Sequence, residues 1–284
     1  MPPRDNPTVR QIRLGAELRK LRETAGRTSR EAAGLLSVDQ AKISHIEAGR
    51  VGVGEERLRR LANFYRCDDT RLVEALCEIT RERRGQFWFD EYRGILTPDF
   101  LDIAELEWHA KALRSLKSVT MPGLFQTESY ARTLFANVWP KLPESEIEAR
   151  VEYRMKRATV LDGDEPPSFE AIIHEAALRM RFGGRHVVRE QLDHLMRLSE
   201  RSNVTVHVIP FTCEDFVEVT QPVLYVTWAV PQLDTVQADS AFGNRFLMAD
   251  AELKKYRLLL NSSKHASLNP EESRQLIHHI AREL

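Results

Sequence analysis

Residues 28–50 of the chain read TSREAAGLLSVDQAKISHIEAGR, and this stretch predicts two short helices joined by a tight turn. Thr28 and Glu31 have the spacing of a capping box, in which each side chain bonds to the other residue's backbone amide at a helix start. The second helix begins after Asp39, a favourable N-cap residue, and ends before Gly49. The expected bounds are residues 28–36 for the first helix, 37–39 for the turn and 40–48 for the second helix.

The second helix divides into an apolar and a polar face. Its apolar positions are Ala41, Ile43 and Ile46, and the two isoleucines are expected to face a core. In a helix-turn-helix, the second helix lies in the major groove of DNA, where glutamine can pair with adenine and lysine with guanine. The amino end of the preceding helix can hold a phosphate, and Arg50 is placed to contact the DNA backbone. The residues expected to contact DNA are Thr28, Ser29, Arg30, Gln40, Ala41, Lys42, Ser44, His45 and Arg50. The alternative is that these residues form the solvated face of an ordinary helical bundle.

Further helical patterns surround this stretch at residues 8–24, 55–65 and 68–84, so we expect residues 1–85 to form an all-α domain. This region holds 18 Lys and Arg against 13 Asp and Glu, a net charge of +5, whereas the remainder of the chain carries -6. A basic domain on an acidic body suits a partner that is rich in phosphate.

An aromatic segment follows, with the sequence FWFDEY at residues 87–92, and we take residues 86–94 as a junction. These rings could stack on nucleobases. They could equally form a plug that packs the helical domain onto the next one, which is the commoner use of large aromatic side chains.

Residues 95–284 predict a larger mixed α/β (α+β) domain, in which several helices cover a small sheet. The clearest strand signal is the alternation in VTVHV at residues 204–208. Helical patterns occupy residues 102–118, 127–138, 144–161, 186–200, 250–260 and 270–283. Strand patterns occupy residues 169–173, 204–209, 223–228 and 234–237.

Residues 14–23, LGAELRKLRE, and residues 43–50, ISHIEAGR, resemble the lambda-repressor-like helix-turn-helix regulators of the XRE type. The resemblance implies DNA binding, and it implies that Glu47 is a buried acidic residue that bonds within the domain. Ser37 stands where the family has a glycine in the turn, so it has to accept a strained left-handed backbone. Ala32 stands where a bulkier core residue is usual.

Residues 121–132, MPGLFQTESYAR, are similar to a signature of actinobacterial regulators of the WhiJ-like developmental, antitoxin-like family. Further similarities extend over nearly all of residues 87–284. The resemblance implies a regulator encoded beside a small protein, with a C-terminal domain that binds this partner or an effector and helps to form a homodimer. The partners expected are therefore a double-stranded DNA operator, a second copy of the chain and a small protein encoded nearby.

The same signature supplies candidates for a partner-binding groove. A turn at Pro122 and Gly123 precedes a helix that Thr127 caps. Aromatic residues and arginine are favoured at protein interfaces, so the exposed-looking side chains of this stretch could line such a groove. These candidates are Phe125, Gln126, Tyr130 and Arg132. The alternative is that Phe125 and Tyr130 pack a loop onto the body of the domain.

The sequence contains no HExxH, GxSxG, phosphate-binding P-loop or dinucleotide-binding glycine motif. His174 beside Glu175 and the pair His278–His279 are more simply read as structural, since adjacent histidines on a helix point about 100° apart. Cys213 has no identifiable base. We therefore expect no catalytic residue, no metal and no cofactor. The alternative function is a DNA-binding module fused to an enzymatic or small-ligand-sensing domain.

Composition agrees with a protein of the cytoplasm. The three cysteines form no CxxC pair, which fits a reducing compartment. No stretch approaches the roughly eighteen apolar residues of a membrane span. The N-terminal residues, MPPRDNPTVR, lack the apolar core of a signal peptide.

Overall fold

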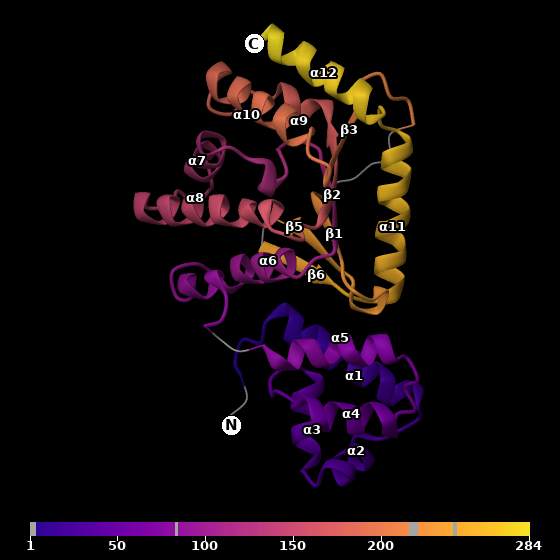
Figure 1. The fold of residues 1–284 in the computed structure, drawn as a ribbon. Helices are drawn as coiled ribbons and strands as arrows, with labels where there is room; N and C mark the ends of the chain where they lie inside the picture. Colours follow the sequence, from indigo (N-terminus) through magenta and orange to yellow (C-terminus); the bar gives the residue numbers. More distant parts are fainter. Residues whose placement is uncertain (1–3, 83–84, 216–220, 241–242) are drawn as a thin grey trace. The chain divides into compact units, whose positions relative to one another are not determined.

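The computed structural model describes residues 4–82, 85–215, 221–240 and 243–284, which form two compact units (Figure 1). Neither unit is continuous in sequence, unlike the expected domains 1–85, 86–94 and 95–284. The first unit comprises the described part of Met1–Arg93 with Thr97–Leu106 and Trp228–Asp234. The second comprises Gly94–Leu96 with the described parts of Glu107–Thr227 and Thr235–Leu284.

The helices at the start of the first unit begin within two residues of the expected positions. The fifth ends at Arg81, and its expected end at Arg84 lies outside the described residues. These helices are α1 (Val9–Thr24), α2 (Ser29–Leu36), α3 (Gln40–Glu47), α4 (Glu55–Phe64) and α5 (Thr70–Arg81).

The core of the first unit is aliphatic, and each helix contributes to it at helical spacing. Leu18, Ile43, Leu58, Leu61 and Leu76 are at most 2% exposed. Burying such a side chain stabilises the fold by about 1.5–3 kcal/mol. This apolar packing, together with local caps on the short helices, accounts for helices that would be marginal in isolation.

Two later segments of the chain complete the first unit through polar contacts with α1. One belongs to α6 (Pro98–Trp108), where the Asp102 carboxylate accepts a hydrogen bond from the Val9 amide at 3.1 Å. The other contains the short helix η4 (Pro231–Leu233) and places the Trp228 ring 4.4 Å from the Arg10 guanidinium carbon. The first unit therefore depends on residues that lie far along the chain.

The second unit is built on a six-stranded sheet with the order β3-β2-β1-β4-β5-β6. The strands β1, β2 and β3 are parallel, and β4, β5 and β6 continue the sheet antiparallel. The strands are β1 (Ala112–Lys117), β2 (Ser168–His174), β3 (Val204–Ile209), β4 (Val223–Thr227), β5 (Thr235–Ser240) and β6 (Gly243–Leu247).

Helices cover both faces of this sheet, as expected for a mixed domain. In Figure 1, α11 lies on one face while α7, α8 and α10 lie on the other. The helices of this unit are α7 (Glu128–Ala136), α8 (Glu144–Ala158), α9 (Glu175–Arg179), α10 (Arg185–Leu198), α11 (Asp250–His265) and α12 (Pro270–Glu283).

The predicted helix over residues 102–118 is wrong in its second half. The helix ends at Trp108, and residues 112–117 form β1, which pairs with β2 on one side and β4 on the other. Leu113 and Leu116 fit a helical spacing as well as a strand in a covered sheet, so only the long-range pairing decides between them. The sequence also missed the edge strand β6, whose exposed and half-exposed residues lack an apolar pattern.

Within the described residues, no helix is both long enough and apolar enough to cross a membrane.

Candidate nucleic-acid interface

The turn between α2 and α3 has the strained geometry that the sequence requires. Ser37 adopts a left-handed backbone with φ 53° and ψ 49°, a conformation that costs about 1–2 kcal/mol for a residue other than glycine. Ala32, five residues earlier, is fully buried, so the smaller residue still belongs to the core.

The two faces of α3 are as predicted. Ile43 and Ile46 are 1% and 5% exposed and belong to the core. On the opposite side Gln40, Ala41 and Ser44 are exposed, and Lys42 and His45 are half-exposed. The Asp39 carboxylate accepts a hydrogen bond from the Lys42 amide at 2.6 Å, which confirms the predicted N-cap. The outward side chains at the start of α3 are therefore presented on a capped, rigid helix.

A buried ion pair holds the end of α3 against α1. The Arg22 guanidinium donates two hydrogen bonds to the Glu47 carboxylate, Nε to Oε1 at 2.6 Å and Nη2 to Oε2 at 3.0 Å. Both side chains are 10% exposed. Glu47 thus bonds within the unit, as the family resemblance implied. A bidentate pair of this kind fixes the direction of α3 as well as its distance from α1.

Two glycines allow the same helices to approach closely. A Cβ on Gly15 of α1 would lie 2.5 Å from the Glu47 carbonyl oxygen. Gly49 has φ 73°, and a Cβ added to it would lie 2.7 Å from the Gln11 carbonyl oxygen. No side chain fits at either position, so α1 and the end of α3 are in backbone contact.

The amino end of α2 confirms the predicted capping box. The Thr28 hydroxyl accepts a hydrogen bond from the Glu31 amide at 3.2 Å, and the Glu31 carboxylate accepts one from the Thr28 amide at 2.8 Å. The hydrogen bonds that the carboxylate accepts from the Thr28 amide and the Thr28 hydroxyl lower the pKa of Glu31. The amides of Ser29 and Arg30, the first two of the helix, have no partner within α2 and face its amino end, where anions are favoured.

Two arginines flank this surface. Arg30 and Arg50 are exposed, and neither side chain forms a hydrogen bond or ion pair with another described residue. Arg50 follows α3, and Arg30 lies in the first turn of α2. The nine residues predicted to contact DNA therefore fall on two neighbouring helices and the segment after α3, and none of them is in the core.

Rings of the aromatic junction contact one another within the first unit. The rings of Phe87 and Phe89 stack at 5.2 Å, and Trp88 meets the Phe89 ring edge-on at 5.7 Å. Phe89 and Tyr92 are buried. Phe89 and Tyr92 are therefore too buried to stack on a nucleobase, whereas Phe87 and Trp88 are half-buried.

The expectation that the signature residues of the C-terminal domain are exposed is wrong for three of the four. Phe125 and Tyr130 are fully buried and Gln126 is 5% exposed. The Phe125 ring lies 4.6 Å from the Phe169 ring, and the Gln126 amide donates to the Met121 carbonyl at 2.9 Å. Only Arg132 reaches the surface, where it pairs with two glutamates of α7 and α8. The alternative, that this loop packs onto the body, is what the structure shows.

Three polar residues that could have suggested a catalytic or metal site, His174, Glu175 and His279, make contacts within the fold. His174 Nδ1 accepts a hydrogen bond from the Ala176 amide at 3.2 Å and so caps α9. The Glu175 carboxylate bonds to the Phe211 amide at 2.7 Å and to Arg179. His279 lies 3.0 Å from Glu283 on the same helix. Among the described residues, no group of three or more histidine, cysteine or acidic side chains is arranged to hold a metal ion.

Sequence reasoning missed Arg22, because nothing in the local pattern marks it as the partner of a residue twenty-five positions away. It also missed the role of Gly15, although an unexplained glycine inside a helical pattern is a signal of close packing.

Comparison with known families finds two matches along the chain. Residues 13–77 match a helix-turn-helix domain, and residues 100–279 match a domain of unknown function, DUF5753. Searches of curated proteins and of solved structures found no match. The second match alone spans more than half of the chain. With a helix-turn-helix domain followed by this domain, the chain belongs to the DUF5753 family.

Proposed function

We propose that this protein is a sequence-specific transcription regulator that acts in the cytoplasm. The observation that carries the proposal is α3, a short helix with a capped amino end, a buried aliphatic face and an outward row of Gln40, Lys42, Ser44 and His45. Glutamine and lysine at the start of such a helix are suited to adenine and guanine edges in the major groove. Ala41 adds apolar surface, and Thr28, Ser29, Arg30 and Arg50 are placed to bind the phosphates on either side.

The regulator acts in this proposal as a homodimer. One α3 covers only a few base pairs, so useful affinity requires a second copy on an adjacent half-site. The chain is not strongly basic overall, with a net charge of -1, and its affinity for DNA therefore depends on the local charge of residues 1–85, which is +5.

The C-terminal domain acts by binding rather than by catalysis, and it responds to a small protein encoded nearby or to an effector, as in developmental and antitoxin-like systems. Two observations support this. The side chains that could suggest an enzyme, His174 and Glu175, are engaged in capping and backbone contacts. The segment Trp228–Asp234 follows β4 and precedes β5 in the sequence, and it belongs to the first unit. Its Trp228 ring contacts the guanidinium group of Arg10 in α1.

The test is selection of duplexes from a random pool by the purified full chain, followed by anisotropy on the selected duplex and on a shuffled one. We expect specific binding at least about a thousandfold tighter than non-specific binding at physiological salt. Equal affinity for both duplexes across a range of salt concentrations contradicts sequence-specific recognition. Addition of nucleotides, esters and phosphoesters to the same sample, with product analysis, tests the absence of catalysis.

A further inference from the structure

The connection between β4 and β5, Trp228–Asp234, is a compact loop that belongs to the first unit, and we call it the β4–β5 loop. The Trp228 amide donates a hydrogen bond to the Asp234 carboxylate at 3.1 Å, which joins the two ends of the loop. Within the loop, the Leu233 amide donates to the Val230 carbonyl at 3.0 Å. These four residues are each at most 8% exposed. The loop is therefore a closed structure that is held by its own hydrogen bonds.

The β4–β5 loop contacts the amino ends of two helices of the first unit. The Trp228 ring lies 4.4 Å from the guanidinium carbon of Arg10, which is in the first turn of α1. The Gln232 side-chain amide donates a hydrogen bond at 2.9 Å to the carboxylate of Asp69, which is the N-cap residue of α5. The loop therefore ties the first turn of α1 to the start of α5.

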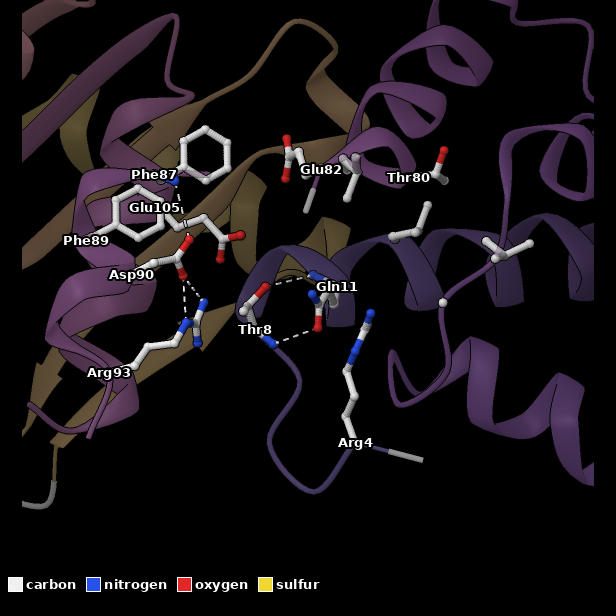
Figure 2. Close-up of a pocket in the computed structure, with 14 residues that line it drawn as sticks. Arg4, Thr8, Gln11, Thr80, Glu82, Phe87, Phe89, Asp90, Arg93 and Glu105 are labelled. Atoms are coloured by element: carbon white, nitrogen blue, oxygen red, sulfur yellow. Dashed lines mark hydrogen bonds and ion pairs between the residues drawn. The ribbon is translucent and has the colours of Figure 1, made fainter. Parts of the chain in front are cut away.

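Arg10 is the side chain through which the loop holds α1. It is 4% exposed, and its guanidinium group also pairs with the Glu82 carboxylate. Figure 2 shows the same turn of α1, with the hydrogen bonds between Thr8 and Gln11, and with Glu82 and Glu105 on the wall of a cavity of about 90 Å³. A buried guanidinium group that meets both a carboxylate and an aromatic ring is restrained by both, and the first turn of α1 is restrained with it.

The residue after Arg10 makes the contact with the segment that follows α3. A Cβ on Gly49 would lie 2.7 Å from the Gln11 carbonyl oxygen, so the two backbones touch. Arg50 comes next, and its amide donates a hydrogen bond to the His45 carbonyl of α3 at 2.9 Å. Two backbones in contact have no flexible side chain between them to absorb a displacement. A shift of the first turn of α1 is therefore passed to Gly49 and Arg50.

We propose that the β4–β5 loop is a positioning element for DNA binding, in which Trp228 holds Arg10 and, through α1, sets the place of Arg50 against a DNA phosphate. Trp228 touches no DNA in this proposal and acts only through α1. The part that concerns DNA rests on the proposed function as a DNA-binding regulator.

The loop also gives the C-terminal domain a route to the segment after α3. The two ends of the loop continue into β4 and β5, which are paired strands with Val226 opposite Thr235. A partner that changes these strands displaces the loop and with it the first turn of α1. Such a partner alters DNA binding without touching DNA, provided that it binds one arrangement of the strands better than another.

The first test measures hydrogen exchange by mass spectrometry in the full chain without DNA. Trp228→Leu keeps an apolar side chain but removes the aromatic face over Arg10. We expect the amides of residues 49–53 to exchange about fivefold faster or more, measured relative to the amides of α2 as an internal reference. Trp139→Leu makes the same change at a side chain that is 86% exposed, and this matched control should exchange as the wild type does.

Trp228→Phe provides a second variant in case Trp228→Leu does not fold. It keeps an aromatic face over Arg10, so we expect a smaller acceleration of the same segment, with Trp139→Phe as its control. Exchange that rises equally in residues 49–53 and in α2 shows a loss of stability alone and overturns the positioning role. Exchange of residues 49–53 that neither variant changes overturns it as well.

The second test is a double-mutant cycle on DNA affinity. Trp228→Leu is expected to weaken binding to the selected and the shuffled duplex alike by about threefold and to reduce the salt dependence, because a displaced Arg50 loses its phosphate contact. In an Arg50→Ala background the same substitution should change affinity by less than about 1.5-fold.

Equal losses in the two backgrounds, or no loss in either, overturn the link from the loop to Arg50. If the wild type does not discriminate between the selected and the shuffled duplex, the proposed sequence-specific function fails. The exchange measurement uses no DNA, so its result on the loop and residues 49–53 stands independently.

Discussion

At the scale of single residues, the exposed surface of α2, α3 and the segment after α3 carries two kinds of side chain. Some are suited to contacts with base edges, and others are suited only to contacts with phosphate groups. Gln40 and Lys42 start α3 and point outward, where base edges lie in a helix-turn-helix complex. Arg50 lies after the helix, on a segment held by backbone contacts to α1. Base contacts specify a sequence whereas phosphate contacts position the protein, so substitutions at these places have different effects.

The variants Gln40→Ala and Lys42→Ala are each expected to cost roughly 1–3 kcal/mol of binding to the selected duplex and to relax its sequence preference. Arg50→Ala is expected to weaken binding to all duplexes about equally and to reduce the salt dependence. Anisotropy on selected and shuffled duplexes at several salt concentrations separates the two effects. The same response of all three variants on both duplexes contradicts the role of α3.

Glu47 is expected to act through stability and not through DNA contact. Glu47→Ala leaves the Arg22 guanidinium without its bidentate partner, and we expect a loss of about 1–3 kcal/mol in the free energy of unfolding. Urea denaturation measures it, and the exposed Glu56→Ala serves as the control with a change within about 0.5 kcal/mol. A Glu47→Ala variant as stable as the control shows that the ion pair contributes little.

At the scale of elements, α1 is the helix on which the recognition surface depends. One face carries Gly15 and Arg22, which set its distance from α3. Its amino end is capped by Thr8 and receives the Asp102 carboxylate from α6. The same helix thus joins the late segments of the first unit to the end of α3.

The amino end of α1 predicts a dependence of stability on pH. Burial raises the pKa of Asp102 to about 7 in the folded protein, while an unfolded aspartate titrates near 4. The folded state therefore binds this proton more tightly, and its contribution to stability is present below about pH 4 and lost as the pH rises to about 7. Asp102→Asn, which still accepts the Val9 hydrogen bond, should become progressively more stable than the wild type over that range.

Denaturation of the wild type and the variant across this pH range measures the difference. Asp68→Asn, at an exposed position, is the matched control and should show no such trend. A difference between the wild type and Asp102→Asn that stays constant with pH contradicts the raised pKa.

At the scale of the whole molecule, the proposed function requires two copies of α3 and a connection between the two parts of the chain. The match to DUF5753 covers residues 100–279, yet Thr97–Leu106 and Trp228–Asp234 belong to the same compact unit as the helix-turn-helix. Two of the contacts that they make with α1 are the Val9–Asp102 hydrogen bond and the Arg10–Trp228 pair.

We expect the full chain to be a homodimer that protects an inverted repeat with half-sites spaced by about one helical turn. Light scattering at working concentration and footprinting on the selected duplex measure both properties. A monomer that protects a single half-site contradicts this arrangement.

The junction predicts a second property of the dimer. Trp88 packs within the aromatic cluster, so Trp88→Ala should leave α2 and α3 folded because their caps and core lie elsewhere. If the cluster sets the orientation of the recognition helices, the variant should lose far more affinity on a two-half-site duplex than on one half-site. Anisotropy on both duplexes decides this, and matched losses refute the orienting role in favour of direct stacking on DNA.

The sequence alone determined α2, the turn and α3, because capping residues, helix-ending glycine and the spacing of Ile43 and Ile46 all act over a few neighbouring positions. It also determined β3 and α12, whose patterns are uninterrupted. Only the tertiary structure decided that residues 112–117 are a strand, that Arg22 is the partner of Glu47, and that Phe125 and Tyr130 are buried. Only it brought Glu105 and Glu82 to one cavity. In each of these cases the deciding partner lies many residues away, and a local pattern carries no information about which distant group will meet it.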